Sequence, residues 1–432
     1  MNQPESLERY DVPVVGGGPA GVVAATQAAA AGANTLLVEA SGMLGGTTTR
    51  AGINFPGLFH AWGRQVIAGY GWQLVTDCVD LCGDELPDFT KVPDRHFHHQ
   101  VKVSRPVYTC LCDEMVTGAG ADVLFFAMPQ AVTPTDTGWR VTLATKTGPV
   151  EREAAVVIDA TGDANVVELA GGAIRRHEQE HQPGTQSCVM SGYDMAELDL
   201  PAINAALREA VDRGEVRVHD VGWNTRDVDI RRWLSCGGRN ANHIPGIDGR
   251  TSAGRTQMQL AGRAAIMRLF RFLKQQPGLE NLCIDELPPE CGVRETATIV
   301  GDKTITAEDY TTGRVWDEAV CYSFYPIDLH VSDDAGLDCR PLEAPRVPTV
   351  PRGALLPAGL SRIAVAGRCV SSDRLANSAL RVQASAMAMG QAAGAMASLA
   401  AEGGTDLREV AIDTVRARLA DHGAVVPEKV DG

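Results

Sequence analysis

The chain has 432 residues, of which 44% are hydrophobic and 22% are charged, as is typical of a soluble globular protein. This length is too great for one small core, so we expect two or three lobes. The formal net charge of −15 argues against a nucleic-acid partner, because phosphate backbones are bound by basic surfaces.

The N-terminal residues are polar and acidic and contain no apolar segment, so they do not resemble a secretory signal, and we expect a cytoplasmic protein. Polar residues interrupt every long apolar run, so we expect no membrane span. The eleven cysteines are scattered and lack C-x-x-C spacing, so we expect buried thiols and no bound metal. We expect a small-molecule substrate, and the sequence leaves open whether the chain forms a homo-oligomer.

The strongest signal lies near the start of the chain. An apolar strand at residues 12–15 runs directly into Gly16-x-Gly18-x-x-Gly21, and an Ala-rich helix is predicted at residues 20–31. This order is typical of a dinucleotide-binding site. In such a site Gly16 permits a tight turn, Gly18 admits a pyrophosphate, and Gly21 lets the helix pack closely on the strand.

A second apolar run, at residues 35–38, ends at Glu39. A carboxylate at this point accepts hydrogen bonds from the hydroxyls of an adenosine ribose, which favours FAD or NAD over NADP. The N-terminus of the preceding helix, with its unpaired amides and positive dipole end, favours the pyrophosphate of either cofactor.

Farther along the chain, short alternating runs at residues 122–127 and 139–143 predict an antiparallel meander. Two more apolar strands, at residues 154–158 and 362–366, are each followed by small residues that allow close approach of a ligand. We therefore expect three distant parts of the chain to return to one sheet. The small residues after these strands include Ala160, Thr161, Gly162 and Gly367.

Residues 173–350 differ in character, because they mix helices and strands without phosphate-loop glycines. We predict helices and strands at residues 195–213, 251–276, 297–300 and 319–329. The apolar stretch at residues 378–400 predicts a buried helix, in which Gly390-x-x-x-Gly394 allows close packing against a strand or the cofactor in a soluble core.

Together these elements predict an α/β fold. Residues 1–172 and 351–432 would form a Rossmann-like cofactor domain, with a parallel sheet covered by helices on one face and by the antiparallel meander on the other. Residues 173–350 would form an inserted α+β substrate domain.

Several segments together resemble a known family. They are residues 14–21 (VVGGGPAG), 44–49 (LGGTTT), 156–163 (VVIDATGD), 292–296 (GVRET), 325–330 (YPIDLH), 365–368 (VAGR), 380–382 (LRV) and 390–394 (GQAAG). The chain resembles the FAD-dependent oxidoreductases of the glutathione-reductase superfamily, in particular the group labelled FAD_oxidored. The resemblance runs nearly end to end.

The resemblance implies an FAD laid extended over the sheet, with its pyrophosphate near Gly367 or Asp373 and its adenine near the backbone around Gln130. The turn at Arg381 and Val382 would bring N–H groups toward the flavin pyrimidine edge. The cofactor-binding residues implied by the motifs and the resemblance are Gly16, Gly18, Pro19, Ala20, Gly21, Glu39, Ala40, Gly45, Gly46, Thr47, Gln130, Ala160, Thr161, Gly162, Gly367, Arg368, Asp373, Arg381 and Val382.

The sequence also departs from parts of this superfamily. The early dithiol of disulfide reductases is missing, and no second GxGxxG indicates an internal NAD(P)H domain. The motif reads Gly162-Asp163-Ala164 where hydroxylases usually show Asp-Gly. A flavin-dependent monooxygenase is therefore the second hypothesis, and a non-catalytic dinucleotide-binding scaffold is the third.

Flavin performs hydride transfer itself, so the protein must supply a general base and hold the substrate. Histidine is the natural base near neutral pH. His330 is the first candidate, against a histidine that is only structural at a strand end, and His243 and His60 follow. Arg294 and Glu295 either form a bracing ion pair or anchor the substrate, and we favour the ion pair.

The function we predict from the sequence is that of a FAD-dependent dehydrogenase or oxidase. It would transfer hydride between a small organic substrate and the N5 atom of the flavin.

Overall fold

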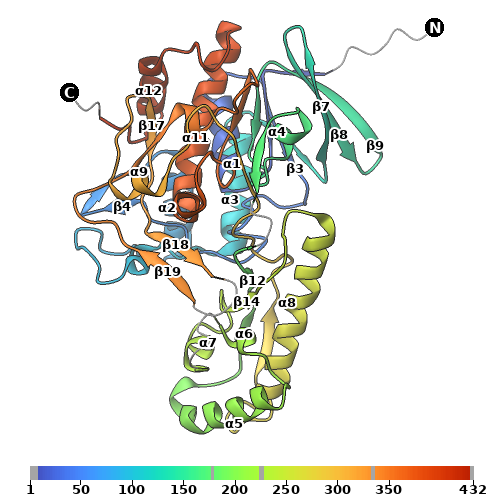
Figure 1. Ribbon diagram of the computed structural model, residues 1–432, viewed down its shortest axis with the longest axis vertical. Coiled ribbons are helices and arrows are strands. Elements are labelled where there is room, and N and C mark those ends of the chain that lie inside the picture. Colours follow the sequence, from blue (N-terminus) through green and yellow to red (C-terminus); the bar gives the residue numbers. More distant parts are fainter. Residues whose placement is uncertain (1–7, 177–179, 223–227, 332–335, 429–432) are drawn as a thin grey trace.

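The computed structural model describes residues 8–176, 180–222, 228–331 and 336–428 (Figure 1). Its centre is a five-stranded parallel sheet in the order β21, β10, β2, β3 and β6. These strands span β2 Val12–Val15, β3 Thr35–Glu39, β6 Asp122–Phe125, β10 Val157–Asp159 and β21 Ile363–Val365. The sheet therefore unites three distant parts of the chain, as the sequence predicted.

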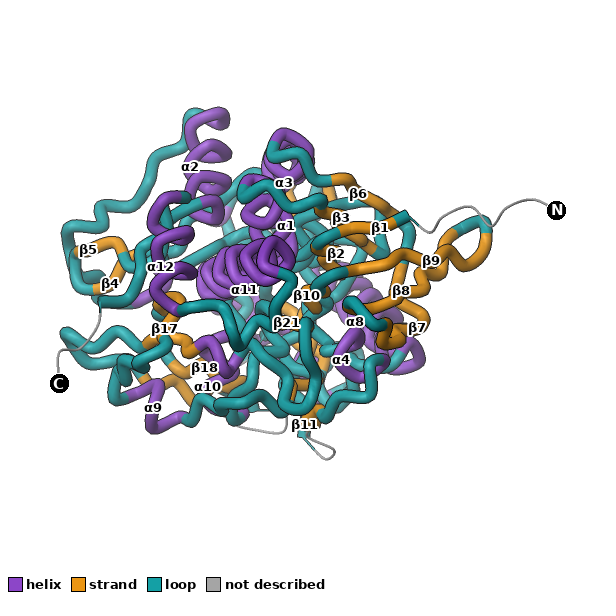
Figure 2. The backbone as a smooth tube through the Cα atoms, turned by 90° about the horizontal axis from the view of Figure 1, so that it is seen from above, coloured by secondary structure: helices purple, strands orange, loops and turns teal. Residues whose placement is uncertain are grey.

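Alternate residues of the sheet face two different layers, which lie on either side of the strands in Figure 2. Val14 and Ile158 belong to the core shared with the helices, whereas Val15 and Val157 belong to the core shared with the meander. The helices are α1 Pro19–Ala30, α3 Arg105–Gly118 and α11 Gln383–Gly403. The meander strands are β7 Met128–Thr135, β8 Gly138–Thr145 and β9 Gly148–Ala154.

One predicted meander segment was assigned wrongly. Residues 122–125 form β6, which pairs in parallel with β3, with Leu124 opposite Val38. Helix α3 lies between β3 and β6 in the chain and provides the crossover that a parallel pair needs. The short alternating pattern alone could not distinguish this edge strand from a meander strand.

Helix α11 crosses α1 at two glycines. A Cβ atom added to Gly390 would lie 2.1 Å from the carbonyl oxygen of Ala20, and one added to Gly394 would lie 2.5 Å from that of Ala24. Close packing at this pair is therefore present, but it is against helix α1 and not against the strand or cofactor that we predicted. The helix predicted at residues 378–400 is instead two helices, α10 Arg374–Leu380 and α11.

We expect Gly390→Ala to lower the free energy of unfolding by about 1–3 kcal/mol, because the new methyl group would force the two helices apart. Gly403→Ala is the matched control, because it lies in the same helix and its Cβ would be 3.4 Å from the nearest atom, on Thr405. Thermal and urea unfolding will measure both changes. Equal stability of the two variants would contradict the packing of α1 on α11.

Part of the middle segment extends away from the sheet, with α5 at the far end (Figure 1). Its core includes Leu207 of α5, Trp233 of α7 and Leu269 of α8. The main elements here are β12 Gly184–Gln186, α5 Leu200–Asp212, α6 Val218–Val221, α7 Arg231–Ser235, β14 Asn242–Ile244 and α8 Ser252–Leu273.

Two predicted elements of the middle segment have different bounds. Helix α5 begins only at Leu200, because Asp199 caps it by accepting a hydrogen bond from the amide of Ala202. The strand predicted at residues 319–329 is two strands, β17 Ala319–Tyr322 and β18 Ile327–His330. Pro326 separates them, since proline cannot donate a ladder hydrogen bond.

The remaining elements complete the described chain. They are β1 Arg9–Tyr10, β4 His60–Ala61, β5 Arg64–Gln65, α2 Tyr70–Cys82, α4 Asn165–Leu169, β11 Ile174–Arg176, β13 Val189–Ser191, β15 Cys283–Glu286, β16 Ala297–Ile299, α9 Ala307–Thr311, β19 Leu337–Arg340, β20 Thr349–Pro351 and α12 Ile412–Asp421. Strand β17 packs on α11, so this later part of the middle segment lies against the main body.

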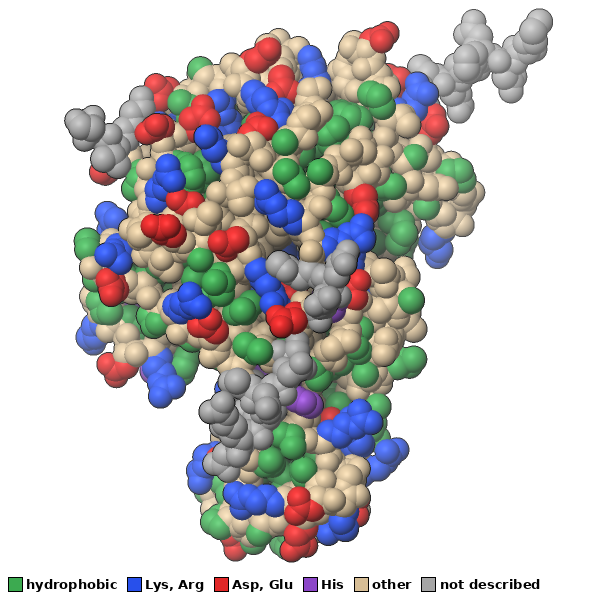
Figure 3. Space-filling model, viewed as in Figure 1, with side chains coloured by type: hydrophobic (Ala, Val, Ile, Leu, Met, Phe, Trp, Pro, Cys, Tyr) green, Lys and Arg blue, Asp and Glu red, His purple; other side chains and the backbone are tan. Residues whose placement is uncertain are grey.

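Acidic and basic side chains are interspersed on the face of the molecule shown in Figure 3. Among the helices of the described residues, none has the length and apolar character that crossing a bilayer requires. All eleven cysteines are free thiols.

Candidate functional site

A cavity of about 1520 Å³ opens where the sheet strands end. Its wall includes Gly16 after β2, Glu39 at the end of β3, Ala160 after β10 and Gly367 after β21. In open parallel sheets, ligands bind outside the carboxyl ends of the strands. Segments that are far apart in the sequence thus line one ligand-sized space.

Most of the predicted cofactor residues line this cavity. They are Gly16, Gly18, Pro19, Ala20, Glu39, Gly46, Thr47, Ala160, Thr161, Gly162, Gly367, Arg368, Arg381 and Val382. Gly21 and Gly45 lie just behind the wall. A Cβ on Gly21 would be 1.7 Å from the Gly16 carbonyl oxygen, and the Gly45 amide donates to the Gly17 carbonyl at 2.8 Å.

Besides Gly21 and Gly45, three predicted cofactor residues do not line the cavity. The carboxylate of Asp373 caps α10 through the Ala376 amide at 2.8 Å and also accepts a hydrogen bond from the Ala307 amide at 2.6 Å. Gln130 is exposed at an irregularity in the pairing of β7 with β8, and Ala40 is exposed just after β3. These three residues therefore stay predictions that the lining of the cavity does not support.

Gly18 differs from its neighbouring glycines. A Cβ added to Gly16 would lie 2.5 Å from the Ala160 carbonyl oxygen, whereas a Cβ on Gly18 would meet no protein atom within 4 Å. The φ of Gly18 is −75°, which any residue can adopt. Neither packing nor backbone conformation requires glycine at position 18, so the open space in front of it is available to a ligand.

Glu39 is buried and already has protein partners. Its carboxylate accepts hydrogen bonds from the Gly17 amide at 2.8 Å and the Ser41 amide at 2.7 Å, and it pairs with Arg50 at 2.6 Å. Arg50 also pairs with Glu290 at 3.2 Å. The acid therefore fixes the glycine loop as well as facing the cavity.

Arg368 lines the cavity but is held by the protein. Its guanidinium donates to the carbonyl oxygens of Gly162 at 2.8 Å and Val293 at 2.7 Å, and it pairs with Asp163 at 2.6 Å. Arg255 also pairs with Asp163, at 3.1 Å. Arg368 thus joins the loop after β10 to the loop after β21.

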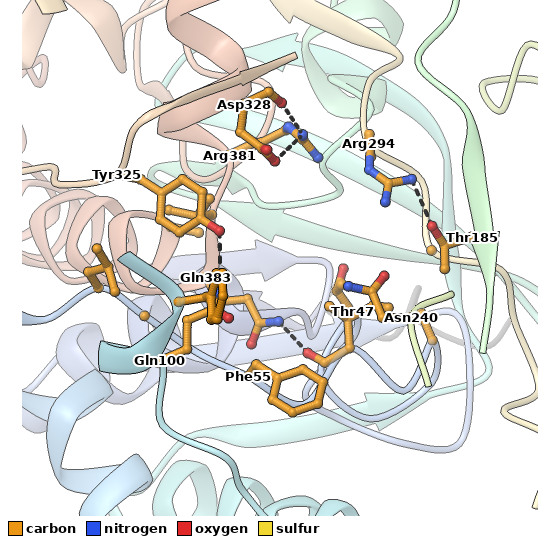
Figure 4. Close-up of a pocket in the computed structure, with 18 of the residues that line it drawn as sticks. Thr47, Phe55, Gln100, Thr185, Asn240, Arg294, Tyr325, Asp328, Arg381 and Gln383 are labelled. Carbon is orange, nitrogen blue, oxygen red and sulfur yellow. Dashed lines mark hydrogen bonds and ion pairs between the residues drawn. The ribbon is translucent and has the colours of Figure 1, made fainter. Parts of the chain in front are cut away.

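A second part of the wall carries a polar cluster, of which Figure 4 shows Arg294, Asp328 and Arg381. Asp328 and His330 are alternate residues of β18 and lie on the same side, with His330 Nε2 3.3 Å from Asp328 Oδ2. Arg381 donates to the carbonyl oxygen of Asp328 at 3.0 Å. Arg294 donates to Thr185 Oγ1 at 2.7 Å and shares a hydrogen bond of 3.2 Å with His243 Nε2.

Burial and the nearby arginines set the charge states of this cluster. Burial, with the positive charge of Arg294, lowers the pKa of His330 from 6.5 to about 4. Burial opposes ionisation of Asp328, but the hydrogen bond from His330 and the nearby positive charges, including Arg381, outweigh it and lower the pKa to about 2. Burial lowers the pKa of Arg294 to about 9. At neutral pH His330 is therefore neutral, Asp328 is negative and both arginines are positive.

The other two predicted histidines occupy different positions. His243 is not part of the cavity wall but lies behind Arg294, with its ring 5.2 Å from that of His330. Burial, with the charge of Arg294, lowers the pKa of His243 well below its usual range. His60 lines the cavity and stacks on Phe89 at 3.9 Å within an aromatic cluster.

The expected ion pair between Arg294 and Glu295 is wrong. Successive residues of an extended chain point to opposite sides, so Arg294 faces the cavity while Glu295 pairs with Arg374 at 2.9 Å. The sequence reasoning also left out Tyr325, whose hydroxyl accepts a hydrogen bond from Gln100 Nε2 at 3.1 Å on the opposite side of the pocket (Figure 4).

The family model for FAD dependent oxidoreductases matches residues 11–419. The chain belongs to this family. It is therefore a FAD-dependent enzyme, as the sequence predicted. No curated protein matches the chain.

Solved structures to which the chain has a distant similarity include the anhydrotetracycline hydroxylase OxyS from Streptomyces rimosus. It has a TM-score of 0.44 and 13% identity, over 96% of this chain and 66% of that one. A geranylgeranyl bacteriochlorophyll reductase-like protein from Thermoplasma acidophilum has a TM-score of 0.43 and 16% identity, over 96% and 83%. The p-nitrophenol 4-monooxygenase PnpA from Pseudomonas putida has a TM-score of 0.40 and 12% identity, over 96% and 84%. These distant likenesses carry no assignment of substrate.

The cavity of this FAD dependent oxidoreductase fits its cofactor at two helix ends. Helix α1 begins after Gly18 and α11 begins after Val382, and neither N-terminus is capped by a side chain. Neither helix has an acidic residue in its first turn. Unpaired amides at a helix N-terminus favour phosphate or anionic ring oxygens. The open space at Gly18 and the uncapped start of α1 suit a pyrophosphate.

Proposed function

We propose that this FAD-dependent enzyme is a dehydrogenase or oxidase that moves hydride between a small organic substrate and FAD. The substrate would carry a C–H next to an alcohol or amine, or an activated double bond. One observation carries the proposal: a buried, neutral histidine beside an ionised aspartate lies in the same cavity as the cofactor loops. A general base and a hydride acceptor in one space are what such a reaction needs.

Each group would have a separate role. Bound FAD supplies the hydride acceptor at N5. His330 would accept the proton of the substrate hydroxyl or amine as the C–H bond breaks, so that substrate loses a hydride and a proton together. Asp328, at 3.3 Å from His330 Nε2, would orient the imidazole and stabilise its protonated form.

The cofactor would be held by residues that line the cavity. Gly16, Gly18 and the start of α1 would hold the pyrophosphate, and Glu39 would hold the adenosine ribose. The backbone around Val382 at the start of α11 would face the flavin pyrimidine edge, where reduced flavin carries negative charge.

We also propose the domain division that the sequence predicted. Residues 1–172 and 351–432 would bind FAD, and residues 173–350 would hold the substrate. In support, Thr185 and Arg294 of the middle part face the cavity together with the cofactor loops. The arrangement of glycine loop, acid and meander supports a place in the glutathione-reductase superfamily.

The visible spectrum of the purified protein, followed by anaerobic substrate screening, tests this function. We expect a yellow protein whose flavin band is bleached by an alcohol, amine or saturated precursor without oxygen. A hydroxylated product formed only with NAD(P)H and oxygen would replace the proposal with a monooxygenase. Retained flavin that neither a substrate nor NAD(P)H can reduce would indicate a non-catalytic scaffold.

A further inference from the structure

We propose that the substrate of this enzyme carries a carboxylate, which Arg294 binds through its guanidinium with support from Arg381. This inference rests on the proposed function, because it names the substrate class of the same cavity. It is carried by the donors, the charge balance and the position of these two arginines.

Arg294 has hydrogen-bond donors to spare. Its Nη1 uses both hydrogens, on the Pro183 carbonyl at 2.5 Å and on Thr185 Oγ1 at 2.7 Å. Its Nη2 uses one hydrogen toward His243 Nε2 at 3.2 Å. Among the described residues, the second Nη2 hydrogen and the Nε–H have no acceptor. These contacts fix the plane of the guanidinium, which lines the cavity.

Arg381 adds a second incompletely satisfied guanidinium. Its Nη2 donates to the carbonyl oxygen of Asp328 at 3.0 Å and to Gln182 Oε1 at 3.3 Å. Its Nε is buried without a hydrogen-bond partner in the described part of the chain. Arg381 lines the same cavity as Arg294, so its positive charge also favours an anion there.

The charge of Arg294 is not matched by an ion pair within the described residues. Asp328 lies 3.6 Å from Arg381 and is the carboxylate of this cluster, while His330 and His243 are neutral at neutral pH. Arg294 forms no ion pair with any described carboxylate, so its positive charge has no direct partner among the described residues. A carboxylate monoanion on the substrate would supply that partner.

The other arginines near the cofactor loops contrast with this pair. Arg50 pairs with Glu39, and Arg255 and Arg368 both pair with Asp163. Arg294 instead contacts Thr185 on β12 and His243 on β14, away from the glycine loop. Figure 4 shows it beside Thr185 and Asn240, across the pocket from Tyr325. An arginine with free donors in this position suits two oxygens of one planar carboxylate.

Calorimetric titration of the holoprotein tests the proposal. The probes are acetate, benzoate and phenylacetate, each compared with its neutral amide. We expect at least one carboxylate to bind about tenfold or more tightly than its amide, because the amide cannot balance the charge. The proposal is overturned if no carboxylate binds, if each binds no better than its amide, or if phenylphosphonate binds more tightly than all three.

Variants show which arginine is responsible. Arg294→Gln should remove the preference for carboxylate over amide, and Arg294→Lys should restore part of it. Arg213→Gln is the charge-matched control, because Arg213 is exposed and pairs with Glu215 on the surface, and it should change nothing. The wild-type comparison stands even if Arg294→Gln fails to fold.

Two further results separate this inference from the proposed function. Flavin content and anaerobic bleaching are measured on the same samples, so a protein that binds carboxylates but never transfers hydride would refute only the function. A shift of the flavin reduction potential in Arg294→Gln, with an unchanged carboxylate preference, would assign the positive charge to the cofactor and overturn the inference.

Discussion

Gly18→Val should abolish retention of FAD and leave the fold intact. The backbone at Gly18 has φ −75° and ψ −175°, so valine fits it without strain, and its Cβ meets no protein atom within 4 Å. The side chain would instead occupy the space in front of α1, where the pyrophosphate is expected. We expect the affinity for FAD to fall by about a hundredfold or more, by loss of a charge-assisted anion site.

Flavin absorbance after gel filtration, together with circular dichroism, measures this effect. Gly118→Val is the matched control, because Gly118 is also in open space but lies at the exposed end of α3. Gly21→Ala should lose FAD and stability together, since its Cβ would lie 1.7 Å from the Gly16 carbonyl oxygen. Unchanged flavin content in Gly18→Val would refute the placement of the pyrophosphate.

His330→Gln should lower kcat by about 10²–10⁴-fold, because glutamine cannot accept a proton at neutral pH. The side chain still offers an amide to Asp328, so we expect unchanged flavin content. His98→Gln is the control, because His98 is exposed and does not line the cavity. Steady-state kinetics of the three proteins, with the substrate found by anaerobic screening, will measure the change. If the His330→Gln enzyme is as active as wild type, His330 has only a structural role.

The pH profile of the wild-type enzyme gives a second measure of the same group. The pKa of His330 is lowered to about 4, so its imidazole is unprotonated and available as a base throughout the neutral range. Activity as kcat/KM should therefore stay level from about pH 7.5 to pH 5.5 and fall only as the pH approaches about 4. An ordinary histidine would already cause about a tenfold loss at pH 5.5. A fall of kcat/KM with an apparent pKa near 6.5 would show that another group is the base.

The parts of the site that follow local patterns could be predicted from the sequence. Gly16, Gly18 and Gly21 stand at fixed intervals after an apolar strand, and the structure places them where that spacing requires. The strands at residues 154–158 and 362–366 were also recognisable, because buried parallel strands are continuously apolar. Each of these features is determined by a short local segment, so the sequence alone was enough to predict it.

The polar cluster could not be predicted in this way. Arg294, His330 and Arg381 meet only because the segment after β15, strand β18 and the end of α10 converge on one cavity. No local pattern encodes that convergence. The alternation along Asp328-Leu329-His330 did carry a signal, since alternate residues of a strand share a face. Asp373 lies off the cavity wall for the opposite reason, because its carboxylate acts locally as a helix cap.

The order of the sheet strands also constrains when the enzyme can acquire its cofactor during synthesis. The loops of the expected FAD site follow β2, β10 and β21, so the last of them leaves the ribosome only after residue 367, and the start of α11 later still. Nascent chains and N-terminal fragments would lack part of the expected FAD site. Loading of FAD at the expected site would therefore come late in synthesis, after most of the chain has left the ribosome.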